Sequence, residues 1–157
     1  MRRNPAVFAI LVGGSIAGVL DITYAIVFSW AYRDVPPMRI LQSVASGLLG
    51  APAYEGGVPT AALGLVLHFF IAFSAAAIFY FVSRKIPFLL RYAPLVGVLY
   101  GAGIYAFMNL VVIPLSAFPR KLTFSPLTVG TGLFVHMAFI GLPIALAARR
   151  ASRLAAA

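Results

Sequence analysis

The sequence predicts an all-α polytopic membrane protein with four transmembrane helices. Of its 157 residues, 62% are hydrophobic and 10% are charged, whereas soluble domains are about 45–50% apolar and about 25% charged. The apolar residues form four long runs separated by segments rich in glycine, proline or charge. Each run approaches or exceeds the roughly 20 residues that a helix needs to cross a bilayer. We therefore expect residues 1–157 to form a single transmembrane four-helix bundle.

The first transmembrane helix is expected over about residues 7–30, after a short basic segment. Gly14, Gly18, Asp21 and Ala25 fall on one face of this helix. Small residues at such spacing allow a second helix to approach closely. Asp21 is an acidic residue within an apolar run, which is costly in lipid and needs a partner.

A short helix is expected over about residues 37–49, in the connection to the second span. Proline at its first turn and Gly50 after its end are typical helix boundaries. The segment is too short to cross a bilayer. We expect it to lie in the outer membrane interface or to cap the bundle, either as a plain connection or as part of a binding site.

The second transmembrane helix is expected over about residues 61–82, which contain neither charge nor proline. Gly64, His68, Ala72 and Ala76 recur at steps of four and so share one face. The histidine is the main polar group of this run, and the small residues around it favour close helix packing.

The third and fourth transmembrane helices are expected over about residues 93–115 and 127–147. Pro114 is expected to end or kink the third helix, because an interior proline removes a backbone hydrogen bond. The fourth helix contains His136 and, near its end, Pro143.

The charge distribution predicts the orientation. The net charge is +9, and the basic residues cluster at the ends of the apolar runs, which indicates membrane orientation rather than nucleic-acid binding. One side would carry Arg2, Arg3, Arg84, Lys85, Arg91, Arg149, Arg150 and Arg153, and the other Arg33, Arg39, Arg120 and Lys121. Because cytoplasmic segments are richer in Lys and Arg, we expect a bacterial inner-membrane protein with both termini in the cytoplasm.

Short matches between the two halves suggest an internal duplication. Leu11-Val12-Gly13 and Leu95-Val96-Gly97 open the first and third helices, and a Gly-Leu-x-x-His pattern ends at His68 and at His136. The matches are consistent with two tandem helical hairpins, over residues 1–85 and 91–150, or with chance similarity between glycine-rich helices.

The polar side chains of the four spans are expected to lie in one layer near the outer face. At 1.5 Å per residue, the following fall at similar depth: Asp21, His68, Tyr105, Asn109 and His136. We expect them to form an intramembrane site that binds or conducts a small ligand, an ion or a proton. Two alternatives stay open: hydrogen bonds that only fix the bundle, and a b-type haem held by His68 and His136.

Other chemistry receives little support from the sequence. The chain has no cysteine, which excludes disulfides, thiolate catalysis and iron–sulfur clusters. Two histidines and one aspartate are a conceivable metal-ligand set, but they lack the spacing of a metal motif. Catalytic motifs such as GxSxG or a P-loop are absent, so we expect no enzyme. Partners are expected to be the lipid bilayer and either further copies of the chain or a larger membrane complex.

Several segments resemble a family of small bacterial inner-membrane proteins with four helices. The resemblance is carried by DITYAIVFSW, PPMRILQSVASGLLG, GLVLHFF and FVHMAFIGLPIALAARR. It implies the class and the topology of the protein, and it implies no activity, cofactor or site residue.

Overall fold

The structure, a computed structural model, describes residues 4–119 and 125–156, and within these ranges it contains helices and no strand. The elements are α1 (Pro5–Arg33), α2 (Pro37–Leu49), the 3₁₀ turn η1 (Ala51–Tyr54), α3 (Gly57–Lys85), α4 (Phe88–Arg91), α5 (Ala93–Phe107), the π-helical segment η2 (Met108–Val112), α6 (Ile113–Leu115), α7 (Pro126–Val135), the π-helical segment η3 (His136–Gly141) and α8 (Leu142–Ala156). Arg2, Arg3, Arg120 and Lys121, which enter the orientation prediction, lie outside the described residues.

In the part of the chain that the structure describes, four helices are long and apolar enough to cross a membrane, which confirms the predicted fold class. They cover Pro5–Arg33, Gly57–Lys85, Ala93–Leu115 and Pro126–Ala155. The third and fourth are composite, because η2 and α6 continue α5, and η3 and α8 continue α7. The short helix over residues 37–49 is also present, as α2.

The fourth helix is longer than expected. The apolar run predicts an end at about residue 147, whereas α8 continues to Ala156. The extra turns contain alanine, leucine and arginine, which are among the best helix formers. Ala148 and Ala151 are also buried in the core, so packing holds this extension in place.

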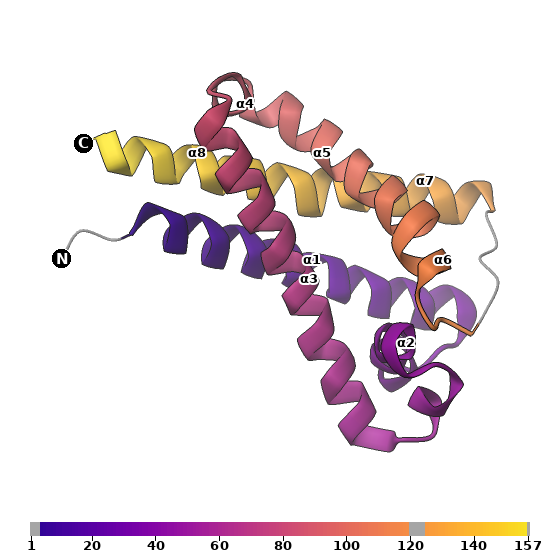
Figure 1. Cartoon of the computed structure of the whole chain (residues 1–157). Helices are drawn as coiled ribbons and strands as arrows, with labels where there is room; N and C mark the ends of the chain where they lie inside the picture. Colours follow the sequence, from indigo (N-terminus) through magenta and orange to yellow (C-terminus); the bar gives the residue numbers. More distant parts are fainter. Residues whose placement is uncertain (1–3, 120–124, 157) are drawn as a thin grey trace.

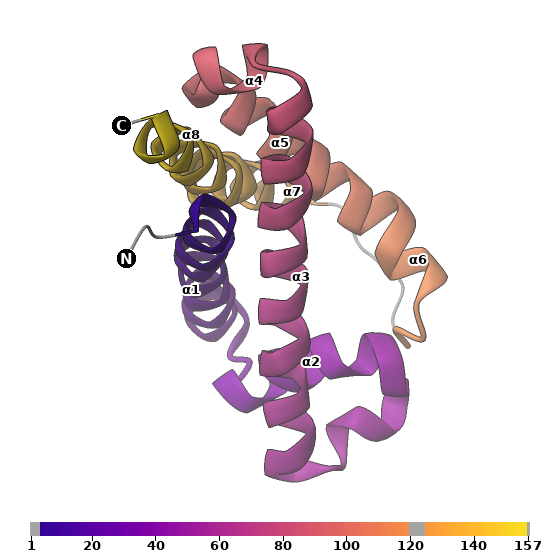
Figure 2. The same cartoon turned by 60° about the vertical axis from the view of Figure 1, so that its left-hand side comes forward.

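The helices do not form a parallel bundle. α1 and the α7–η3–α8 helix run side by side in opposite directions, so that α1 begins and α8 ends at the same end of the molecule (Figure 1). α3 crosses them obliquely and packs mainly against α1 and α2. Figure 2 shows α3 with α1 on one side and α5 and α6 on the other. α2 lies beside the first half of α3, away from the chain termini.

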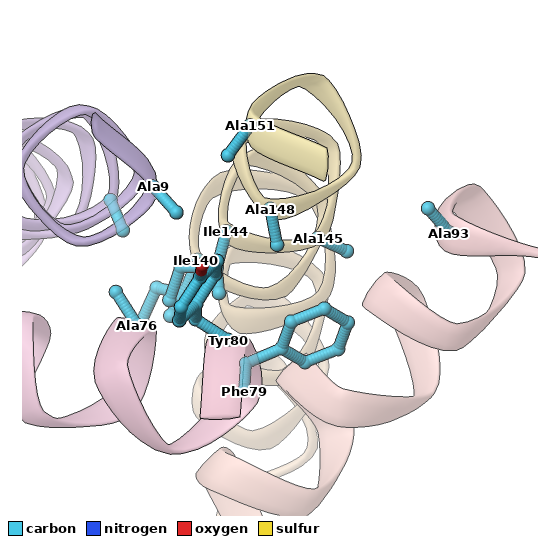
Figure 3. Packing of buried hydrophobic residues seen from close by; sticks show 11 residues of the cluster. Ala9, Ala76, Phe79, Tyr80, Ala93, Ile140, Ile144, Ala145, Ala148 and Ala151 are labelled. Atoms are coloured by element: carbon cyan, nitrogen blue, oxygen red, sulfur yellow. The ribbon is translucent and has the colours of Figure 1, made fainter. Parts of the chain in front are cut away.

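The core between α1, α3, α5 and α8 is built mostly from small residues. Its buried members are Ala9, Ala17, Ala76, Phe79, Tyr80, Ala93, Ile140, Ile144, Ala145, Ala148 and Ala151 (Figure 3). In lipid, helices associate through close packing rather than through the hydrophobic effect, and alanine and glycine permit that approach. One very close approach is at Gly101, where a Cβ atom would overlap the backbone carbonyl of His136.

α2 buries the polar side chains of Gln42 and Ser46 against the protein, while Arg39 is exposed. Gln42, Ala45 and Ser46 are buried, and the Gln42 amide donates a hydrogen bond to the Gly57 carbonyl (3.1 Å). Leu48 is 63% exposed. The exposed surface of α2 is mostly apolar with one basic residue. Such a surface suits a helix in the membrane interface, and it favours the predicted interfacial position.

Two π-helical segments each precede a proline. η2 ends at Val112, two residues before Pro114, and η3 ends at Gly141, two residues before Pro143. Proline removes one backbone donor and its ring clashes with the carbonyl four residues earlier. A local change to π geometry keeps the other backbone groups hydrogen-bonded, as an apolar surrounding demands. The third helix therefore continues past Pro114 to Leu115.

Candidate functional site

A cavity of about 180 Å³ lies within the membrane-spanning part of the protein. α1, α2, α3, α5, η2 and η3 all contribute to it. It is lined by Ala17, Gly18, Asp21, Val44, His68, Ile71, Ala72, Ala75, Ile104, Met108, His136 and Ile140. We call this space the polar cavity, because it brings together three of the five candidate residues: Asp21, His68 and His136.

The carboxylate of Asp21 has no hydrogen-bond or ion-pair partner among the described residues. The side chain is half-buried in α1, three residues after Gly18. One turn further along, the Tyr24 hydroxyl is buried and also lacks a partner in the part of the chain that the structure covers. An acidic residue at the centre of a membrane helix costs about 2.5–3.5 kcal/mol on insertion scales. Asp21 thus has a carboxyl group for which the described protein supplies no partner.

His68 is fixed by a hydrogen bond between helices. Its Nε2–H donates to the Gly18 carbonyl of α1 at 2.9 Å. Since a carbonyl can only accept, this bond assigns the proton to Nε2 and makes Nδ1 the acceptor of the neutral ring. The Phe69 ring packs beside Gly18, where a Cβ atom would lie 2.7 Å from it. Glycine at this position therefore allows α3 to come close enough for the bond.

His136 opens the π-helical segment η3. Its Nδ1–H donates to the Gly132 carbonyl one turn earlier, at 2.9 Å. Its Nε2 is therefore the acceptor of the neutral ring. π-helical turns are rare and often occur at functional sites, and here η2 and η3 contribute Met108, His136 and Ile140 to the polar cavity.

Tyr105 and Asn109 do not line the polar cavity. The Tyr105 ring packs edge-on against His136, with 5.2 Å between ring centroids. The Asn109 side chain donates to the Tyr105 carbonyl at 2.9 Å, within its own helix. These two residues thus support His136 and α5 from outside the cavity rather than facing its interior.

The geometry does not suit a directly coordinated metal ion. Within the described residues, no group of three or more His, Cys, Asp or Glu side chains lies close enough to hold one ion. Asp21, His68 and His136 border a shared space without converging on a point. Such an arrangement suits a ligand with atoms of its own between the three side chains, or bound water.

A haem does not fit the polar cavity as it stands. Benzene occupies a cavity of about 150 Å³, and a porphyrin is several times larger than benzene. The polar cavity measures about 180 Å³. In addition, Nε2 of His68 is already bonded to the Gly18 carbonyl. The two histidines face one cavity, as the haem alternative requires, but the space between them suits a much smaller molecule.

The polar cavity adjoins a larger apolar opening between α3 and α5. This lateral groove has a volume of about 410 Å³. It shares four lining residues with the polar cavity: Ile71, Ala75, Ile104 and Met108. Phe70 and Phe107 on its rim are well exposed. The groove therefore offers a route from the acyl-chain region of the bilayer to the polar groups.

Met108, Ile104 and the lateral groove are parts of the site that the sequence does not predict. Met108 begins a π-helical segment, and a proline follows that segment. The proline inside this apolar helix was thus the sequence signal from which a locally irregular helix could have been predicted. The groove itself depends on the oblique crossing of α3, for which periodicity contains no signal.

No protein-family model, curated protein or solved structure matches the chain. The resemblance to a bacterial inner-membrane family and the internal duplication stay predictions from the sequence.

Proposed function

We propose that this integral membrane protein binds a small organic cation in the polar cavity. The observation that carries the proposal is the carboxylate of Asp21, which faces the same cavity as His68 and His136 and has no partner among the described residues. A buried charge is stabilised when it is paired and hydrogen-bonded. A ligand with an ammonium group would supply the missing charge, and the histidine acceptor nitrogens would receive further hydrogen bonds.

The size and lining of the polar cavity support a ligand with a benzene-sized apolar body. Its volume of about 180 Å³ slightly exceeds the roughly 150 Å³ that accommodates benzene. Besides the three polar residues, its side chains are aliphatic or methionine. Hydroxyl, thiol and amine side chains are missing from this lining, so we propose a binding protein rather than an enzyme.

The packing toward the chain termini supports binding over conduction. On that side of the polar cavity the helices meet through the apolar core of Ala9, Ala76, Phe79 and Ile144 (Figure 3). Protons and ions cross a membrane along polar groups or water. The lateral groove, by contrast, connects the cavity with the bilayer, so we propose that an amphipathic ligand enters sideways.

We expect benzylamine to stabilise the purified protein and benzyl alcohol of nearly equal size to stabilise it much less. At a free concentration one hundred times the dissociation constant, one bound ligand contributes about 2.7 kcal/mol to stability. Thermal unfolding in detergent measures the effect as a rise in the midpoint temperature. The difference between the two compounds reports the charge pairing with Asp21.

The variant Asp21→Asn should lose the response to benzylamine while keeping an unliganded midpoint close to that of the parent. Asp34→Asn is the matched control, because Asp34 is exposed at the end of α1 and should leave the response intact. An equal response to both compounds, or a full response of Asp21→Asn, would contradict the proposal.

For the location, we propose the bacterial inner membrane with both termini in the cytoplasm. The absence of cysteine allows single-cysteine variants without background labelling. In intact spheroplasts, a membrane-impermeant maleimide should label Glu55→Cys, and should label Lys85→Cys only after the membrane is opened. Both positions are exposed. The reverse pattern would show that the orientation is inverted.

A further inference from the structure

A cluster of cations surrounds the turn between α3 and α5. Arg84 and Lys85 end α3, and Arg91 ends α4. All three are exposed, and within the described part of the chain none of them forms an ion pair. The guanidinium of Arg91 lies over the Tyr92 ring, 5.5 Å from its centroid. These three residues, the basic cluster, carry positive charge for which the described protein provides no acidic partner.

An apolar groove begins directly beneath the basic cluster. The basic-end groove has a volume of about 350 Å³, within the range of sites that bind small molecules, about 300–1,000 Å³. Its walls come from α3, α4 and α5, and include Val82, Leu89 and Val96. Val82 lies two residues before Arg84, and Leu89 lies two residues before Arg91. The same two helix ends thus supply both the charges and the apolar walls.

Two aromatic rings form the floor of this groove. Tyr100 donates a hydrogen bond to the Ala75 carbonyl of α3 at 2.8 Å, and its ring packs edge-on against Phe79 with 5.0 Å between centroids. At the far end, Gly103 leaves room, since a Cβ atom there would meet nothing within 4 Å. Seven residues of helix separate Val96 from Gly103, the first and last α5 residues of the lining, which corresponds to about 10 Å of depth. The groove therefore runs along α3 and α5 away from the basic cluster and has an apolar lining, as a hydrocarbon chain requires.

We infer that an anionic glycerophospholipid binds here, with its phosphate at the basic cluster and one acyl chain in the basic-end groove. Basic residues next to membrane helices attract anionic lipid, and basic pockets between helices bind anionic headgroups. The rule that cytoplasmic segments are positive explains the charges. It does not explain an apolar groove on the same helix ends that carry the charges. The lipid would fill the space between α3 and α5 and support the oblique position of α3.

Native mass spectrometry of the detergent-purified protein tests the inference. Phosphatidylglycerol and phosphatidylcholine with identical acyl chains are compared, and glycerol 3-phosphate is tested without chains. We expect phosphatidylglycerol to be retained at a roughly tenfold lower concentration than phosphatidylcholine, and glycerol 3-phosphate not to be retained in that range. Equal retention of the two lipids, or retention of glycerol 3-phosphate alone, would overturn the inference.

Two pairs of variants separate the charges from the groove. The first double variant, Arg84→Gln with Arg91→Gln, should weaken phosphatidylglycerol binding at least fivefold. The control double variant, Arg150→Gln with Arg153→Gln, removes the same charge from α8 and should change phosphatidylglycerol binding less than twofold. Gly103→Phe should fill the groove and weaken both lipids. Gly130→Phe is its control, because a Cβ atom at Gly130 also meets nothing within 4 Å. An equal effect of the two arginine pairs, or no effect of Gly103→Phe, would overturn the inference.

Discussion

Replacement of Gly101 by valine is expected to prevent stable folding. The α-carbon of Gly101 lies against η3, where an added Cβ atom would overlap the His136 carbonyl and come within 2.7 Å of the Met137 α-carbon. Both obstacles are backbone atoms, which cannot rotate away as a side chain can. Overpacking of a core ordinarily costs about 1–3 kcal/mol, and a clash with backbone at the centre of a helix pair belongs at or above the upper end of that range.

Gly103→Val is the matched control for this prediction. Gly103 lies two residues further along α5, and a Cβ atom there meets nothing within 4 Å. Both variants change helix propensity by the same amount, so the difference between them isolates the contact with η3. Unfolding in mixed micelles should show a loss of roughly 3 kcal/mol or more for Gly101→Val and little change for Gly103→Val. Equal losses would mean that α5 and η3 are not packed as described.

The spans could be predicted from the sequence because each depends on local composition. Apolar runs of sufficient length predicted all four transmembrane helices, and the proline and glycine punctuation predicted α2. The fourth helix was predicted too short, because a search for apolar residues stops at Arg149 although the alanine-rich segment continues as a helix. Hydropathy marks where lipid ends, and it does not mark where a helix ends.

From the sequence, the candidate site could be predicted only as a set of polar residues at one depth in the membrane. Depth along each helix suggested that five polar residues lie at one level. Which of them share a space depends on the rotation and crossing of the helices, and these follow from contacts such as Gly18 with Phe69. The polar cavity therefore includes Asp21, His68 and His136, while Tyr105 turns its ring against His136 and Asn109 bonds to its own helix.

Asp21 is the residue on which the proposed function depends most. It is the one acidic residue of the chain that lies within a predicted span, since Asp34 and Glu55 lie in the first connection. Its position on α1 places it in the lining of the polar cavity, and its carboxylate has no partner among the described residues. A hydrophobic carbodiimide, which enters the bilayer and couples to carboxyl groups there, should react with Asp21 in preference to the two exposed acids.

The most direct test is the mass of the purified protein after reaction with dicyclohexylcarbodiimide, with and without benzylamine. We expect a single adduct, which peptide mapping places on Asp21. It should be absent in Asp21→Asn. Because benzylamine can displace the urea from an activated carboxyl and form an amide, the carbodiimide adduct and the Asp21 benzylamide are counted together, and their sum should fall at least tenfold when benzylamine occupies the polar cavity. An adduct on Asp21 that forms equally fast with benzylamine present, or no reaction at Asp21, would contradict a ligand site built around this carboxylate.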